Sequence, residues 1–325
     1  MLSDCGATQK RGCLALSMSG SQTPILYHYS ASPYSEKLRL ALGMAGMQWG
    51  SVIVPSQPPR PLLDAFFAGY RRIPVLQIGA HFYCDSALAF DVLAEVSDRL
   101  TQTGRLSAPE ELLRQHAEER IFFAVINAAS PISVLRLLAQ DLGFLGLFRF
   151  LKDRSDMMND STIEKMSRRV ATRFIKDFVE QLNSLLKLDQ FLAGAHAGYL
   201  DLCCYHPLWM ASVINRETLS ALPPLVQAWM QRVAALGHGS PMPICQNEIH
   251  DKVIADRFQN FVGEVSGPFE QGSLVSVRPT DYARDSTEGY LVLLDEYQCV
   301  IKRNAPSGDA VFLHFPTIGF EVVPL

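Results

Sequence analysis

Residues 24–41, PILYHYSASPYSEKLRLA, contain the pattern that sets the fold of the first part of the chain. The run at 25–29 alternates like a short strand. The apolar residues after it recur at the spacing of a helix that packs on a sheet. Between them, Ser32 precedes Pro33, as an N-cap precedes the first helical position. The stretch therefore predicts a strand, a turn that carries serine hydroxyls, and a helix.

The segments that follow complete one small domain over residues 24–98. WGSVIV at 49–54 predicts a second strand, and PVLQIG and HFYC predict a hairpin around a Gly-Ala turn. A helix is expected from Ser86 to Val96. The order β-α-β-β-β-α predicts a small mixed sheet with helices on its faces.

Residues 105–240 have the pattern of an all-helical domain. Capping boxes of the form Ser-x-x-Glu start at Ser107 and Ser161. After the second box, apolar residues recur every three or four positions from Ile163 to Leu185, which predicts one long amphipathic helix. The mixed sheet is therefore expected to be followed by a helical bundle.

The two ends of the chain differ from these domains. Residues 1–23 carry only a short, broken apolar patch and are expected to form a disordered extension. GHGSPMP at 237–243 has the composition of a linker. Residues 245–325 repeat short apolar runs between turn residues, which predicts a β-rich accessory domain. The predicted fold class is therefore α/β plus all-α, with a small β-rich domain at the C-terminal end.

Composition argues against several classes of protein. The net charge is -4, so no basic excess favours nucleic acid, and no apolar run reaches the roughly 20 residues that span a bilayer. The seven cysteines are irregularly spaced without a C-x-x-C pair, and the histidines lack metal-binding spacing. We therefore expect neither a disulfide framework nor a metal site, and a reducing, cytoplasmic location.

Four segments resemble motifs of the glutathione transferase superfamily at matching positions: SPYSEKLR (32–39), RRIPVL (71–76), YCDSALAF (83–90) and FLAGAHAGYLD (191–201). The resemblance implies a thioredoxin-like N-terminal domain that binds glutathione, followed by a helical-bundle domain. Two positions depart from the family pattern. Gly198 stands where the helix cap is usually Ser or Thr, and Asp85 stands where the acidic residue is usually Glu.

The same segments are similar to a fungal branch of these proteins that carries an extra C-terminal domain. The HFP at 314–316 and the GF at 319–320 resemble the end of that domain. Some members act in natural-product pathways, where they add or remove glutathione at electrophilic carbons or isomerise a double bond through transient addition. The resemblance therefore implies a glutathione transferase or a glutathione-dependent isomerase of secondary metabolite biosynthesis.

The resemblance places Ser32 where a hydroxyl stabilises the glutathione thiolate, with Ser30 as the second candidate. A thiol of this kind has a pKa of about 8.5, so a donor at the positive end of a helix favours the thiolate. From the residues alone, an N-cap explains Ser32 better, because serine before proline is common at helix starts. Ser32 and Ser35 stand where glutaredoxin chemistry would need cysteines.

The other implied contacts follow the tripeptide. A cis bond before Pro74 would turn the Ile73 backbone toward the cysteinyl residue of glutathione. Asp85 and Ser86 are expected at the γ-glutamyl end, since a helix start suits a carboxylate and Asp85 suits an ammonium. Arg72 is the candidate for the glycyl carboxylate. A trans proline, an Asp-Ser helix cap and a solvated arginine are the plain alternatives.

The electrophile is expected between the two domains, against the helix near Ser107 and the segment 142–150. The aromatic candidates for its walls are Phe122, Phe123, Phe144, Phe148 and Trp209. The sequence thus predicts an enzyme whose partners are glutathione and a hydrophobic, electrophilic small molecule, without nucleic acid or membrane; a homodimer is a possible assembly. The rival hypothesis is a non-catalytic glutathione transferase-like binding protein.

Overall fold

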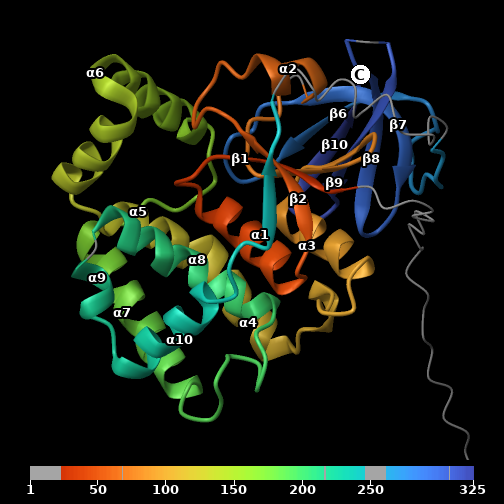
Figure 1. Cartoon of the computed structure of the whole chain (residues 1–325). Coiled ribbons are helices and arrows are strands. Elements are labelled where there is room, and N and C mark those ends of the chain that lie inside the picture. The colour runs from red at the N-terminus through yellow and green to blue at the C-terminus, as the bar shows by residue number, and fades with distance from the viewer. Residues whose placement is uncertain (1–22, 68, 216, 246–260, 307) are drawn as a thin grey trace, which may run out of the picture.

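A computed structural model describes most of the chain, and its elements are shown in Figure 1. The described residues are 23–67, 69–215, 217–245, 261–306 and 308–325. The extension predicted at 1–23 therefore lies outside them, apart from Thr23. In the described part of the chain, no helix is both long and apolar enough to cross a bilayer.

The first region has the predicted alternation of strands and helices. Its elements are β1 (Ile25–His28), α1 (Pro33–Met44), β2 (Gln48–Ile53), α2 (Pro61–Phe67), β3 (Val75–Ile78), β4 (His81–Tyr83) and α3 (Ser86–Glu95). β1 pairs in parallel with β2 and antiparallel with β3, and β3 pairs antiparallel with β4. Gly79 has a positive φ of 57° in the turn between β3 and β4, a conformation that glycine adopts without strain. The predicted thioredoxin-like sheet is confirmed.

The second region is helical, also as predicted. Its elements are η1 (Thr103–Arg105), α4 (Ala108–Gln115), the π-helix η2 (His116–Ile121), α5 (Phe122–Ala128), α6 (Pro131–Met158), α7 (Arg168–Leu185), α8 (Tyr199–Ile214), α9 (Glu217–Ser220) and α10 (Pro224–Ala234). The capping box at Ser107 forms, since Ser107 N–H donates to the Glu110 carboxylate at 2.7 Å.

The predicted start of the long amphipathic helix is wrong by several residues. α7 begins at Arg168, and its N-cap is Ser167, whose hydroxyl accepts a hydrogen bond from the Val170 N–H. The expected box at Ser161 does not form a helix start. Ser161 Oγ accepts a hydrogen bond from the Ile163 N–H at 3.0 Å, and the Thr162 N–H donates to the carbonyl of Asp281 at 2.8 Å, so this segment is also tied to a distant loop.

The C-terminal region is rich in strands and extends the first sheet. Its elements are β5 (Ser240–Pro243), β6 (Leu274–Pro279), β7 (Thr287–Leu294), β8 (Gln298–Asn304), β9 (Ala310–Pro316) and β10 (Phe320–Pro324). One sheet of ten strands has the order β10-β6-β7-β8-β9-β4-β3-β1-β2-β5. The junction is the parallel pairing of β9 with β4. The segment predicted as a linker forms β5, which pairs in parallel with β2.

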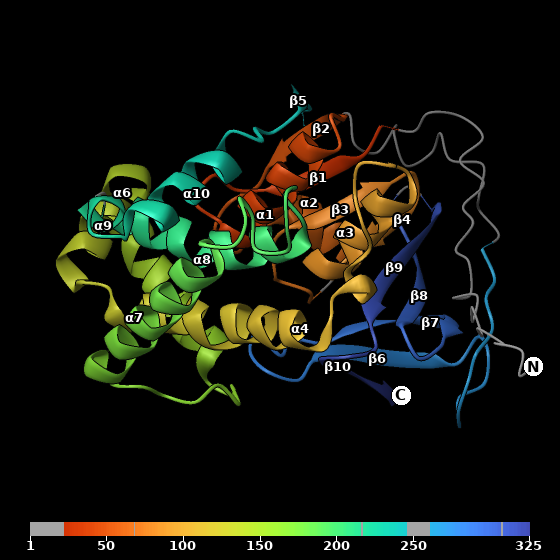
Figure 2. The same ribbon diagram turned by 90° about the horizontal axis from the view of Figure 1, so that it is seen from below.

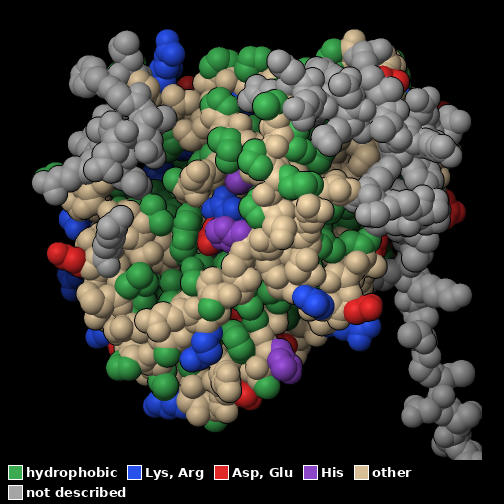
Figure 3. Space-filling view, in the orientation of Figure 1, with side chains coloured by type: hydrophobic (Ala, Val, Ile, Leu, Met, Phe, Trp, Pro, Cys, Tyr) green, Lys and Arg blue, Asp and Glu red, His purple; other side chains and the backbone are tan. Residues whose placement is uncertain are grey.

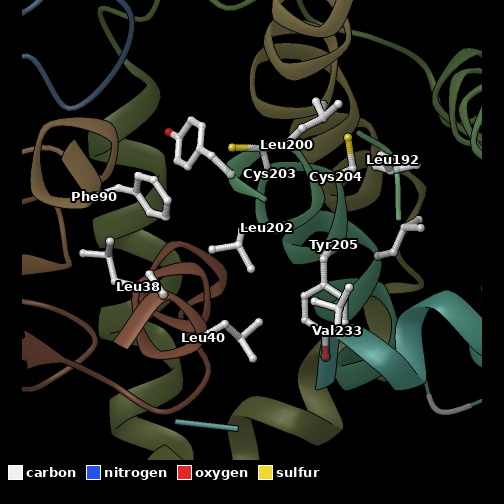
Figure 4. Packing of buried hydrophobic residues seen from close by; sticks show 14 of the residues in the cluster. Leu38, Leu40, Phe90, Leu192, Leu200, Leu202, Cys203, Cys204, Tyr205 and Val233 are labelled. Atoms are coloured by element: carbon white, nitrogen blue, oxygen red, sulfur yellow. The ribbon is translucent and has the colours of Figure 1, made fainter. Parts of the chain in front are cut away.

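Two large apolar clusters hold these regions together. In the first, Leu38 and Leu40 of α1 and Phe90 of α3 face Leu202 and its neighbours on α8 (Figure 4). The second lies between α2 and the shared sheet and combines residues of β1 to β4 with residues of β6 to β9. Figure 2 shows the resulting arrangement, with the helical region beside α1 and the C-terminal strands on the other side of the molecule.

Candidate functional site

One edge of the sheet gathers the residues predicted to contact glutathione. β3 runs antiparallel to both β1 and β4, with Val75 opposite Tyr27 and Leu76 opposite Tyr83. The end of β1, the start of β3 and the end of β4 therefore lie at the same edge. Ser32, Pro74 and Asp85 follow or precede these three strand ends by a few residues, so the fold brings the predicted positions together.

Ser32 caps α1, and its hydroxyl is buried. Its Oγ accepts a hydrogen bond from the Ser35 N–H at 3.1 Å, and the residue is only 1% exposed. Because this bond uses an oxygen lone pair, the hydroxyl proton is still free to be donated to another group. Ser30 is exposed in the preceding turn. The N-cap reading of Ser32 is confirmed, and a donor role is compatible with it.

Arg39 is buried and holds the turn between β1 and α1 in place through hydrogen bonds. Its guanidinium donates to the carbonyls of Tyr29 at 3.3 Å and Ser30 at 3.1 Å, and its Nε donates to Glu36 at 2.9 Å. Glu36 also pairs with His238 at 3.1 Å. In Figure 3, basic, acidic and histidine side chains stand together near the middle of the face, where Figure 1 shows β1 and α1. The β1–α1 turn is therefore held by charged hydrogen bonds.

The peptide bond between Ile73 and Pro74 is cis, as the resemblance implied. Pro74 is buried, Ile73 is half-buried, and Ile73 precedes β3. Among the described residues, neither the N–H nor the C=O of Ile73 takes part in a backbone hydrogen bond. This leaves one donor and one acceptor of the main chain at the site edge for a ligand.

Asp85 and Ser86 start the second helix at this edge. The Asp85 Oδ1 accepts hydrogen bonds from the N–H groups of Ala87 at 2.7 Å and Leu88 at 3.2 Å, so Asp85 is the N-cap of α3. Ser86 is 7% exposed. The cap uses one carboxylate oxygen, and the negative charge stays near the helix start.

Arg72 has a different partner from the one expected. Its Nη2 donates to the Asp281 carboxylate and to the Tyr282 carbonyl, and its guanidinium carbon lies 4.1 Å from the centre of the Tyr282 ring. The side chain is 17% exposed. Arg72 is therefore not a freely solvated surface charge; a loop of the C-terminal region binds it.

Aromatic side chains of α1 and the helical region meet beside Ser32. The Tyr34 ring lies 5.0 Å from that of Phe122 and 4.7 Å from that of His206. Phe123 contacts Tyr282 edge to face at 5.4 Å. Of the other predicted wall residues, Phe148 on α6 is 69% exposed and Trp209 is half-buried, while the side chain of Phe144 lies outside the described part.

A buried ion pair joins α1 to the helical region. The Lys37 ammonium contacts the Glu118 carboxylate of η2 and the Tyr199 hydroxyl at 3.3 Å. Burial alone would raise the pKa of Glu118, but the charges of Lys37 and Arg114 lower it to about 2. Burial and the nearby Lys37 charge lower the pKa of His206 to about 3, so this histidine is neutral. The pair fixes how the two regions meet.

Sequence reasoning missed the residues that act between regions. Lys37 follows Glu36 in a helix that looks amphipathic, and only the apolar residues on all sides of it (Leu38, Leu40, Ala41 and Leu42) signal that it is buried. Nothing in the sequence near Asp281 or Tyr282 indicates that they contact Arg72, because the contact spans about two hundred residues.

A polar cavity of ≈ 360 Å³ opens next to this edge. Its walls include Arg60, Asp64, Arg71, Asp153 and Asp285. None of the predicted glutathione contacts lines it. The cavity therefore lies beside the candidate site, not in it.

Comparison with known proteins supports the N-terminal assignment. Residues 26–98 match the family described as glutathione S-transferase, N-terminal domain. No curated protein sequence matches the chain.

One solved structure resembles nearly the whole chain, and others cover parts of it. A GST-like protein from Pseudomonas syringae has 25% sequence identity and a TM-score of 0.71, covering 94% of this chain and 100% of that one. A glutathione S-transferase domain-containing protein from Marinobacter aquaeolei VT8 has 18% identity and a TM-score of 0.46, covering 65% of this chain and 97% of that one. The fungal branch expected from the resemblance is not confirmed by these comparisons.

The match to the Pseudomonas syringae protein extends over nearly all of both chains, so the C-terminal strands belong to the shared architecture. The chain thus carries a glutathione S-transferase N-terminal domain within a GST-like fold.

Proposed function

We propose that the protein binds glutathione at the edge marked by Ser32, Pro74 and Ser86, and adds its thiol to a hydrophobic, electrophilic small molecule. One observation carries this proposal. Two helix N-termini and the unpaired Ile73 backbone meet at one sheet edge of a domain that matches the glutathione S-transferase N-terminal family. The positive ends of α1 and α3 favour the anionic groups of glutathione there.

Each part of the tripeptide has a partner in this arrangement. The Ile73 N–H and C=O suit the cysteinyl backbone, and the start of α3 at Ser86 suits the γ-glutamyl carboxylate, with Asp85 near its ammonium. The Arg72 guanidinium can bind the glycyl carboxylate once its ion pair with Asp281 is broken. The rings of Tyr34, Phe122 and Phe123 provide apolar surface for the electrophile.

The chemical step needs only a stabilised sulfur anion. The thiol gives its proton to solvent, and the Ser32 hydroxyl donates to the thiolate while its oxygen accepts from Ser35. The thiolate attacks the electrophilic carbon, a C–S bond forms, and the displaced electron pair takes up a proton. In an isomerase, the adduct loses that proton again after bond rotation, the C–S bond breaks, and glutathione leaves unchanged.

Substitution of the two candidate serines tests the assignment. Removing a hydrogen bond to a developing or stabilised anion typically costs about 10²-fold or more in rate. We expect Ser32→Ala to lose about 100-fold in kcat/KM with a model α,β-unsaturated electrophile, and Ser30→Ala to stay near wild type. Wild-type turnover in Ser32→Ala would remove Ser32 from the mechanism.

One rival has specific support. Ser32 is only 1% exposed and Arg72 is already paired with Asp281, as in a GST-like protein that binds no glutathione and acts through other surfaces. Isothermal titration with glutathione separates the two. Binding at millimolar concentration or tighter supports the enzyme, whereas no heat at that concentration favours the non-catalytic protein.

The proposed cellular location, the proposed homodimer and the type of reaction are each tested by a separate experiment. The five cysteines of the described residues are free thiols, which supports the proposed cytoplasmic location. Fractionation of cells that express a tagged chain measures the location, and light scattering measures whether two copies associate. Product analysis with candidate electrophiles separates conjugation from isomerisation and tests a role in natural-product synthesis.

A further inference from the structure

The loop between β6 and β7, residues 280–286, crosses from the C-terminal strands to both other regions. The Asp281 carbonyl accepts a hydrogen bond from Thr162 N–H at 2.8 Å, and Ala283 N–H donates to the Met157 carbonyl at 2.9 Å. Ala283 is 3% exposed and has a φ of 47°, which is strained for a residue other than glycine. The 280–286 loop is therefore fastened to the helical region by its main chain.

The same loop already pairs with Arg72, the cation proposed to bind the glycyl carboxylate of glutathione. Asp281 and the Tyr282 carbonyl share the Nη2 of Arg72, and the Tyr282 ring lies under the guanidinium. The Nε of Arg72 is buried and has no hydrogen-bond partner among the described residues. A carboxylate that bound the guanidinium in bidentate fashion through Nε and Nη2 would have to take the place of Asp281.

Tyr282 also contacts the aromatic cluster beside the candidate site. Its ring packs edge to face on Phe123 and belongs to the same apolar cluster as Tyr34. Burial raises the pKa of Tyr34, and the nearby Tyr282 adds to that shift. Ser32, whose hydroxyl the proposed function uses, is itself only 1% exposed.

We propose that the 280–286 loop is a gate, in which Asp281 holds the carboxylate subsite of Arg72 closed until the carboxylate of an incoming peptide ligand displaces it. The proposal rests on the glutathione-binding function proposed above. Asp281 is a built-in competitor for the glycyl carboxylate, and its release frees Tyr282 and opens the way to Ser32. The C-terminal strands thus set which ligands gain entry: those with an anionic end.

A thiol reporter tests the gate without any ligand. The substitution Ser32→Cys is combined with the wild-type 280–286 loop, with Asp281→Asn and with Asp285→Asn. Asp285 is the matched control, because it lies in the same loop but pairs with Arg71 at 3.3 Å. We expect maleimide labelling of position 32, followed by peptide mass spectrometry, to become about tenfold faster with Asp281→Asn and to stay unchanged with Asp285→Asn.

Tyr282→Ala is the second variant, since it removes the ring that packs against Phe123 and Arg72 and leaves the Asp281 carboxylate in place. Faster labelling there supports the gate as well. Equal labelling rates in all loop variants, with unchanged circular dichroism, would overturn it.

Glutathione affinity, measured by calorimetry on chains that keep Ser32, separates the gate from the function. Asp281→Asn should tighten binding about tenfold, and Asp285→Asn should not. If labelling accelerates but no variant binds glutathione, the gate stands and the proposed function fails. If all chains bind glutathione equally and labelling is uniform, the function stands and the gate is wrong.

Discussion

The Lys37–Glu118 pair shows how one buried charge can fix the relation between two regions. Lys37 comes from α1 and Glu118 from η2, and the side chains are 0% and 11% exposed. Removing one partner of a buried pair leaves the other charge uncompensated, which costs about 3–5 kcal/mol. At the scale of the residue, therefore, the interface next to the candidate site depends on charge as much as on apolar contact.

Glu118→Gln should lower the free energy of unfolding at pH 7 and flatten its fall in acid. Burial acts to raise the pKa of Glu118, but Lys37 and Arg114 hold it at about 2. Because the folded value lies below the unfolded value of about 4.3, the carboxylate stabilises the fold above pH 4.3, and this contribution is lost as pH falls toward 2.

Urea unfolding of both proteins between pH 7 and pH 3 measures this effect. Glu119→Gln, an exposed neighbour in the same π-helix, is the control and should follow the wild-type curve. If the free energy of unfolding falls with pH in parallel for wild type and Glu118→Gln, the Glu118 carboxylate is not a cause of the acid sensitivity.

At the scale of the element, the start of α8 depends on a side chain three residues inside the helix. Gly198 at the N-cap has no side chain to offer, so the Asp201 carboxylate accepts from the Gly198 N–H at 3.0 Å. The same carboxylate accepts from Leu192 N–H at 2.9 Å and from the Trp229 indole at 2.7 Å. Asp201 therefore caps α8 and ties it to α10 and to the preceding loop.

Asp201→Ala should destabilise the protein by several kcal/mol. It leaves the two buried donors of Leu192 and Trp229 and the half-buried Gly198 N–H without an acceptor, and each unsatisfied buried group costs about 1–3 kcal/mol. Thermal unfolding followed by circular dichroism measures the loss, with Asp189→Ala, an exposed position in the same loop, as the control. A midpoint within a degree of wild type would contradict the assignment of Asp201 as the central acceptor.

Elements with local signals were predictable, and elements set by distant partners were not. The helix starts at Ser107 and Ser86 carry their own capping residues, so their positions follow from the sequence. α7 starts later than its apolar pattern suggests, at the N-cap Ser167, and Thr162 before it is bonded to Asp281 of a distant loop. The apparent linker becomes β5 because an unpaired strand edge of β2 lies next to it.

The candidate site follows the same rule. The cap at Ser32, the cis bond at Pro74 and the helix start at Asp85 each lie in a short motif, so the resemblance located them. The partner of Arg72 comes from a loop with no motif of its own, and only the folded chain brings Asp281 to it. Motifs located the positions proposed to contact glutathione, and tertiary structure determined that Arg72, among them, is already paired with Asp281.

At the scale of the whole molecule, the first and C-terminal regions share one core. Phe66, Phe67 and Tyr70 pack in the same cluster as Leu313 and Phe315 of β9. At the seam, His81 bonds to His314 at 2.8 Å, and His314 bonds to Gln298 at 3.1 Å, all of them buried. Neither region can keep this apolar surface away from water without the other.

We therefore expect one unfolding transition for the two regions. Calorimetry of the wild type should show no separate melting of the C-terminal strands. Leu313→Ala, at a fully buried position of β9, should lower the whole transition through a loss of about 2–5 kcal/mol. Two resolved transitions, with only one shifted by Leu313→Ala, would show that the regions unfold independently.

The pairing of β4 with β9 also has a consequence for synthesis on the ribosome. His81 and His314, which meet across this seam, are separated by 233 positions. At about 5–20 residues per second, β4 waits roughly 10–50 seconds for its neighbour. During that time the nascent chain carries an open strand edge, the kind of surface to which chaperones and other strands bind. The thioredoxin-like N-terminal domain is therefore completed only when almost the entire chain has been translated.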